Sequence, residues 1–177
     1  MRKRSLGIAP IVSVLFALTV SCAAPKIDQE TTDCAGPTFD LADPAEPLGS
    51  NEALRTGLRR AVADRTPETT MSAIAKDAGW SSDWDTALSI GGGMTAAKIN
   101  RTPGISVTDS CVRNVPARPD VEGAGITYTV FTKGGRLLQS VKWTEPSPPL
   151  LFRKKDYLLP ETRLVFEQSA GAMATQW

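Results

Sequence analysis

The chain of 177 residues contains no histidine. Without an imidazole base, serine and cysteine nucleophiles lack the activation that Ser-His-Asp and Cys-His arrangements provide. Ordinary catalytic zinc sites also rely on histidine ligands in most arrangements. Carboxylate-pair hydrolases and Ser-Lys systems are enzyme classes that need no histidine. The sequence therefore lowers the expectation of an enzyme, and we expect neither a metal nor a cofactor.

The chain also lacks the positive charge excess that a nucleic-acid binder normally carries. Its formal net charge is +1, and three of its 20 basic residues lie at positions 2–4. The other 17 basic residues stand against 19 acidic ones, so residues 22–177 carry a formal charge of about −2. We therefore expect no nucleic-acid partner.

A sustained hydrophobic run occurs near the N-terminus. Residues 2–4 are Arg-Lys-Arg, and a mostly apolar run from Leu6 to Val20 follows them, as in an export signal. The run is shorter than the roughly 20 apolar residues that a membrane-spanning helix needs. It ends in Leu18-Thr19-Val20-Ser21-Cys22, which resembles the lipobox cut by lipoprotein signal peptidase. Thr19 departs from the motif, which usually has leucine there.

The lipobox resemblance implies a lipid anchor. Residues 1–21 are then a signal peptide, and Cys22 carries diacylglycerol on the extracytoplasmic face of a bacterial cell membrane. Residues 22–49 are rich in Ala, Pro and polar residues, and they are predicted to form the lipidated N-terminus and a flexible tether. Residues 50–177 are predicted to form a single domain. The alternative is an ordinary secretory signal that is cut near Ser21 or Ala24.

Cysteine is scarce, and its count is odd: Cys22, Cys34 and Cys111. An odd cysteine in an exported protein needs an explanation. Lipidation of Cys22 supplies one, because Cys34 and Cys111 are then left as a pair in an oxidising compartment. Their spacing is unlike the C-x-x-C of redox pairs, so we predict a structural disulfide between them. Two unrelated buried thiols are the alternative.

Two helices are predicted at the start of the domain. The first begins at Ser50 or Asn51, because apolar residues follow at helical spacing from Leu54 to Val62. The second is predicted to have Thr66 as its N-cap and Gly79 as its left-handed stop. Phe39 and Leu41 are the tether residues that we expect to contact the core.

Strands follow the helix pair. Alternation over residues 84–90 predicts a half-buried strand that three glycines end, and Thr95 is predicted to cap a short helix through Asn100. Residues 126–131 and 137–143 flank a Lys-Gly-Gly turn and predict a hairpin. Residues 162–168 predict a last strand. The predicted fold class is α+β, with the helix pair and the short helix packed on a small antiparallel β-sheet.

Two segments carry candidate sites. Asp83 and Asp85 flank Trp84 and are the best carboxylate pair for acid–base chemistry, but carboxylates on a solvated strand face explain them without any chemistry, and we favour that structural reading. Phe152-Arg153-Lys154-Lys155 lies within an apolar stretch, Leu150–Leu159, and is predicted to form a contact loop with a basic tip. A partner protein of the envelope or an anionic headgroup would suit such a loop. An ordinary core strand is the alternative.

The order of strand, glycine turn, short helix and hairpin between Trp80 and Phe166 resembles small, uncharacterised bacterial lipoproteins of the actinobacterial type. The hairpin sequence Tyr128-Thr-Val-Phe-x-x-Gly-Gly-Arg-Leu137 is part of that resemblance. The order is also similar to the small lipoprotein subunit of the outer-membrane assembly machinery and to the β-lactamase-inhibitor-protein fold. These families imply binding rather than catalysis, but an architectural likeness transfers no site residues.

Overall fold

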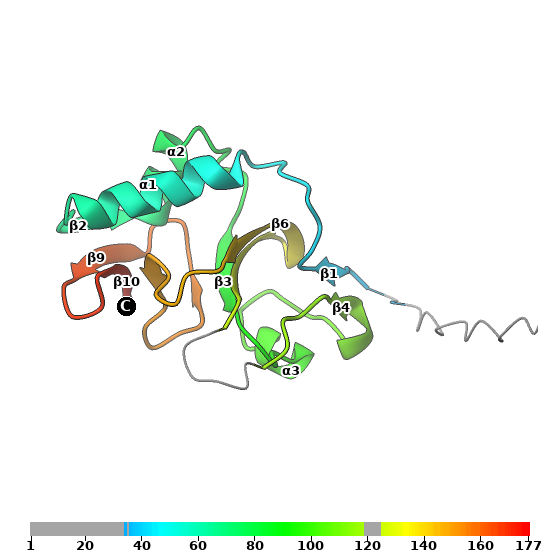
Figure 1. Cartoon of the computed structure of the whole chain (residues 1–177). Helices are drawn as coiled ribbons and strands as arrows, with labels where there is room; N and C mark the ends of the chain where they lie inside the picture. Colours follow the sequence, from blue (N-terminus) through cyan, green and yellow to red (C-terminus); the bar gives the residue numbers. More distant parts are fainter. Residues whose placement is uncertain (1–33, 35, 119–124) are drawn as a thin grey trace, which may run out of the picture. The chain divides into compact units, whose positions relative to one another are not determined.

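The computed structural model describes residues 34, 36–118 and 125–177 (Figure 1). The predicted signal peptide, Cys22 and the first part of the predicted tether lie outside these residues. In the described part, the helices are α1 (Asn51–Ala63), α2 (Met71–Asp77) and α3 (Ala96–Ile99), with a 3-10 turn at Asp109–Cys111. No helix of this part has the length and apolar character needed to cross a membrane.

The central element is a four-stranded antiparallel sheet with the strand order β6-β5-β3-β8. The predicted hairpin forms its larger half, with Gly134 and Gly135 in the turn and both at positive φ. The strand predicted over residues 84–90 begins at Thr86. The strands of this sheet are β3 (Thr86–Ile90), β5 (Thr127–Lys133), β6 (Arg136–Trp143) and β8 (Tyr157–Leu158).

Both faces of the central sheet are covered, which differs from the half-buried strand that alternation predicts. Ala87 and Phe131 belong to a hydrophobic cluster on one face, with the helix pair and the second sheet. Leu88 and Val130 belong to a second cluster, with α3 and the segment around Phe39. Alternation alone misses this, because side chains such as threonine also fill buried positions in β5.

The second sheet is mixed and has the strand order β2-β9-β10-β7. Strand β10 pairs antiparallel with β9 and parallel with β7, and α1 packs against it (Figure 1). The predicted last strand corresponds to β9, whereas β10 follows it and was not predicted. The strands are β2 (Glu68–Thr70), β7 (Leu150–Leu151), β9 (Arg163–Glu167) and β10 (Ala172–Gln176).

The helix pair forms, but the prediction of its second N-cap is wrong. Helix α1 is capped by Ser50, one of the two predicted candidates, since its side chain accepts a hydrogen bond from the backbone N–H of Ala53. Helix α2 is capped by Thr70, not Thr66. The reason is tertiary: residues 68–70 extend to pair with β9, which delays the helix by one turn. Gly79 follows α2 at φ +73°, as predicted.

A third, two-stranded sheet joins residues distant in sequence. Strand β1 (Phe39–Asp40) pairs parallel with β4 (Val112–Arg113). Phe39 and Leu41 are almost fully buried, and Leu48 is buried as well. Part of the segment assigned to the tether is therefore packed in the fold from Phe39 onward.

Helix α3 forms with Thr95 at its N-cap position, as predicted, but another side chain makes the capping hydrogen bond. Thr95 makes no side-chain capping bond, and Asp109 Oδ1 instead accepts from the backbone N–H of Ala96 at 2.9 Å. Asn100 then ties the helix end to Val107 through two hydrogen bonds of 2.8 and 2.9 Å. The fold class is α+β as predicted, but its strands divide among three sheets, where the sequence predicts one.

Candidate functional site

A disulfide joins Cys34 to Cys111, two of the three cysteines. Their Cα atoms lie 4.9 Å apart across a separation of 77 residues. Cys111 is buried in the 3-10 turn directly before β4, and Cys34 precedes β1. The bond therefore lies next to the parallel β1–β4 pair, where the N-terminal segment joins the body of the fold.

The carboxylates of Asp83 and Asp85 both contact the turn of the β5–β6 hairpin. Asp83 forms an ion pair with Lys133. Asp85 Oδ2 accepts a hydrogen bond from the backbone N–H of Gly134 at 2.7 Å. The two side chains are exposed, and Trp84 between them is buried. These contacts give both acidic side chains a structural role, because they attach the segment before β3 to the turn of the hairpin.

The predicted contact loop connects β7 to β8 and has an exposed basic tip. Leu150 and Leu158 at its two ends are buried, and Phe152 is half-buried. Arg153 is fixed by Glu167 of β9, whose carboxylate accepts from its Nε at 3.1 Å and its terminal nitrogen at 2.6 Å. The loop therefore combines the two alternatives left open by its sequence: its ends are core and its tip is surface.

The two lysines of the tip differ in their surroundings. The Lys155 ammonium lies 3.7 Å from the centroid of the Trp177 ring and 5.3 Å from that of Tyr157. The two aromatic rings meet edge to face at 5.2 Å. Lys154 is exposed, at φ +64°, and makes no ion pair within the described part of the chain. The tip thus presents cations beside a partly exposed tryptophan.

A shallow groove of about 490 Å³ lies beside the contact loop. Trp177, Glu167 and Thr175 contribute to it from the C-terminal strands, and sequence reasoning missed all three. Only the tertiary structure shows that these residues belong to the groove, because β10 must pair with β9 before Trp177 comes near the loop. Thr175 also fixes the loop, since its hydroxyl accepts from the backbone N–H of Arg153 at 2.8 Å.

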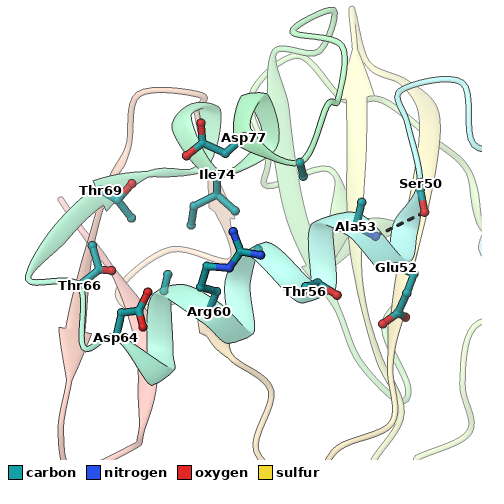
Figure 2. A pocket seen from close by; sticks show the side chains of 13 residues that line it. Ser50, Glu52, Ala53, Thr56, Arg60, Asp64, Thr66, Thr69, Ile74 and Asp77 are labelled. Carbon is teal, nitrogen blue, oxygen red and sulfur yellow. Dashed lines mark hydrogen bonds between the residues drawn. The ribbon is translucent and has the colours of Figure 1, made fainter.

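A second groove, of about 580 Å³, lies between α1 and α2 (Figure 2). Three small residues, Gly57, Ala61 and Ala78, line it, and Arg60 extends from α1 toward Ile74. No sequence pattern predicts this groove. Its charged lining residues are Glu52, Arg60, Asp64 and Asp77.

Arginine–glutamate pairs connect distant parts of the surface. Arg163 of β9 donates from Nε to Glu68 of β2 at 2.7 Å, and this hydrogen bond lowers the pKa of the glutamate. The hydrogen bond from Arg153 lowers the pKa of Glu167 in the same way. Arg59 of α1 forms an ion pair with Glu145, and the hydrogen bond from Arg59 lowers the pKa of this glutamate. These pairs favour ionised carboxylates at neutral pH.

Comparison of the chain with protein-family models, with curated proteins and with solved structures gives no match. The resemblance to bacterial lipoproteins therefore stays a prediction from the sequence.

Proposed function

We propose that the chain is a membrane-anchored lipoprotein of the bacterial cell envelope, and that its folded part is a binding or scaffolding module. The observation that carries the proposal is the pairing of Cys34 with Cys111. It leaves Cys22, the cysteine of the lipobox-like sequence, as the one cysteine outside the bond. Lipidation would remove this unpaired thiol.

The position of the disulfide supports the same proposal. A lipid on Cys22 would be separated from Cys34 by a short segment, and the bond holds Cys34 against the body of the fold. A force on the anchor would then act on the disulfide and on the β1–β4 pair. A disulfide that closes so long a loop contributes about 2–4 kcal/mol to the free energy of unfolding.

The contact loop supports the binding part of the proposal. Its backbone is held at both ends, by pairing of β7 with β10 and of β8 with β3. A cationic tip on a fixed base loses little conformational entropy when it meets a partner. The candidate partners are an envelope protein with an acidic surface or an anionic headgroup. The competing enzyme hypothesis depends on Asp83 and Asp85, and their contacts with the hairpin turn do not favour it.

Mass spectrometry of the N-terminus from the membrane fraction tests the anchor. We expect a peptide that begins at diacylated Cys22. A Cys22→Ser variant should lose the lipid and leave the membrane fraction, whereas a Cys34→Ser/Cys111→Ser variant should keep both. A mature N-terminus at Ala23 or later would contradict the proposal.

Cross-linking in intact cells tests the contact loop. The anchored chain should give a reproducible cross-linked partner, and Lys154→Glu/Lys155→Glu should reduce its yield. Lys98→Glu/Lys142→Glu is the matched control, with two exposed lysines changed on other elements. Equal yields from the two variants would remove the loop from the proposal.

A further inference from the structure

A third cavity, of about 510 Å³, lies between α2, the segment after it and the turn after β8. Serine hydroxyls and one pair of opposite charges surround two tryptophans. The lining residues are Ser72, Ala75, Lys76, Trp80, Ser81, Ser82, Trp84, Pro160 and Glu161.

The two tryptophans of this cavity belong to an aromatic cluster. The rings of Trp80 and Trp84 lie 5.0 and 5.1 Å from the ring of Phe131, which is fully buried. Trp80 is 6 % exposed and Trp84 is 5 % exposed, so only a strip of each reaches the cavity. The cluster holds these side chains rigidly, which preorganises the aromatic surface for a ligand.

The indole N–H of Trp84 lacks a hydrogen-bond acceptor among the described residues. The buried indoles of Trp80 and Trp143 do have acceptors, at 2.7 Å on Ser50 O and at 2.9 Å on Thr129 Oγ1. No fully buried side-chain nitrogen or oxygen of the described part lacks a partner. The Trp84 N–H is therefore not fully buried, and Trp84 is one of the residues that line the cavity.

The walls of the cavity supply further polar groups. The hydroxyls of Ser72 and Ser82 make no hydrogen bond within the part of the chain that the structure describes. Lys76 and Glu161 add one positive and one negative charge, so the charged lining is balanced. A balanced lining does not select a phosphate or a free carboxylate, and it suits an uncharged ligand with several hydroxyl groups.

The walls are also fixed in place. The backbone N–H of Ser72 donates to Pro160 O at 3.0 Å, which joins α2 to the turn after β8. Within that turn, the backbone N–H of Leu159 donates to Thr162 Oγ1 at 2.8 Å, and the Thr162 N–H donates back to Leu159 O at 3.0 Å. The cavity is therefore already formed without a ligand.

We infer that this cavity binds a neutral pyranose ring of an envelope glycan. The apolar C–H face of such a ring packs on the tryptophan strips, and one ring hydroxyl accepts the Trp84 N–H. The other hydroxyls reach the serines, Lys76 and Glu161. This inference rests on the proposed placement of the chain in the cell envelope, where glycans are abundant.

Saturation-transfer NMR on the purified full chain tests the inference. The probes are an N-acetylglucosamine trimer and maltotriose, with sorbitol as an open-chain polyol that has no pyranose face. Saturation of the aromatic protons should transfer to the ring C–H protons of at least one trisaccharide and not to sorbitol. The absence of transfer to both trisaccharides at millimolar concentration, or equal transfer to sorbitol, would overturn the inference.

Substitutions then locate the binding. Trp84→Phe keeps an aromatic ring but removes the N–H, so we expect roughly three- to tenfold weaker binding of the responding trisaccharide. Trp177→Phe is the matched control and should leave the affinity unchanged. Lys76→Ala/Ser82→Ala alters only exposed residues and should also weaken binding roughly threefold or more. Wild-type affinity in both cavity variants would overturn the inference.

The test is separate from that of the anchor. Glycan binding in solution does not depend on the lipid of Cys22, and the mass of the N-terminus does not depend on Trp84. A negative result in the glycan-binding measurement therefore leaves the mass of the N-terminus interpretable, and the reverse also holds.

Discussion

The ammonium group of Lys155 covers the ring of Trp177, with 3.7 Å between the nitrogen and the ring centroid. The other three tryptophans of the chain are buried, whereas Trp177 is 39 % exposed. Quenching of tryptophan fluorescence by acrylamide should therefore report chiefly on Trp177. We expect Lys155→Ala to increase quenching, because the lysine no longer shields the ring.

Lys154→Ala is the control for this measurement. Lys154 is the neighbouring cation, but the structure does not record it over an aromatic ring, so its loss should leave quenching close to that of the wild type. A cation–π contact at an exposed site contributes roughly 0.5–1 kcal/mol. Equal quenching in the two variants would show that Lys155 does not cover Trp177 in solution.

Thr70→Ala should destabilise the chain by about 1 kcal/mol, as expected for loss of an N-cap. Thr70 Oγ1 accepts from the backbone N–H of Ala73 at 3.1 Å. Thr66→Ala is the matched control, since Thr66 lies outside both helices and should cost less. Urea unfolding at equilibrium measures both free energies. A larger loss at Thr66 would favour the N-cap that the sequence predicts.

Gly135→Ala should destabilise the chain more than Gly134→Ala. Both glycines have positive φ, so alanine at either position costs about 1–2 kcal/mol in backbone strain. At Gly135 an added Cβ would also collide with the carbonyl oxygen of Gly104, whereas the space at Gly134 is open. Overpacking of this kind adds roughly 1–3 kcal/mol. Thermal unfolding of the two variants gives the comparison, and equal losses would contradict the close approach to Gly104.

The three arginine–glutamate pairs predict a dependence of stability on acid pH. Because the folded-state pKa values of Glu68, Glu145 and Glu167 lie below the ordinary 4.5, the unfolded chain binds protons first as the pH falls. The stabilisation is therefore complete above about pH 4.5 and is lost as the pH falls below it toward the lowered values. The effect should be modest and should shrink at high salt, since the pairs are exposed.

Unfolding midpoints measured between neutral pH and acid check this. Glu145→Gln should flatten the acid decline, because it removes one titrating carboxylate. Glu46→Gln is a control, since Glu46 forms no ion pair within the described residues. A decline that is unchanged in Glu145→Gln would mean that the pair with Arg59 does not form in solution.

Local signals in the sequence predicted much of the secondary structure. Ser50, Gly79 and the Gly134-Gly135 turn act through their own backbone neighbourhood, so their positions are readable directly. The prediction of Thr66 as the N-cap of α2 was wrong because Thr70 is an equally good cap. Pairing of residues 68–70 with β9 decides between the two threonines. Strand β10 was missed because its pattern, Ala-Met-Ala-Thr-Gln, is weak until β9 and β7 flank it.

The candidate sites divide in the same way. The Arg153–Lys155 run is visible in sequence because its residues are consecutive. The groove beside it and the cavity at Trp84 each join residues from different elements. The periodicity of the sequence indicates only that Trp84 lies in the core. Asp83 and Asp85 are candidates for a chemical pair because they lie close together in the sequence. The sequence does not show which groups their carboxylates contact, and those groups lie about 50 residues away on the hairpin.

The sequence by itself determined the features that depend on short range. These are the α+β class, the hairpin, the first helix, the lipobox-like segment and the absence of histidine. Only the tertiary structure decided which faces are buried, which threonine caps α2, and what the carboxylates contact. The physical reason is that caps and turns are satisfied within a few residues, whereas burial and hydrogen-bond partners depend on chain segments that meet only after folding.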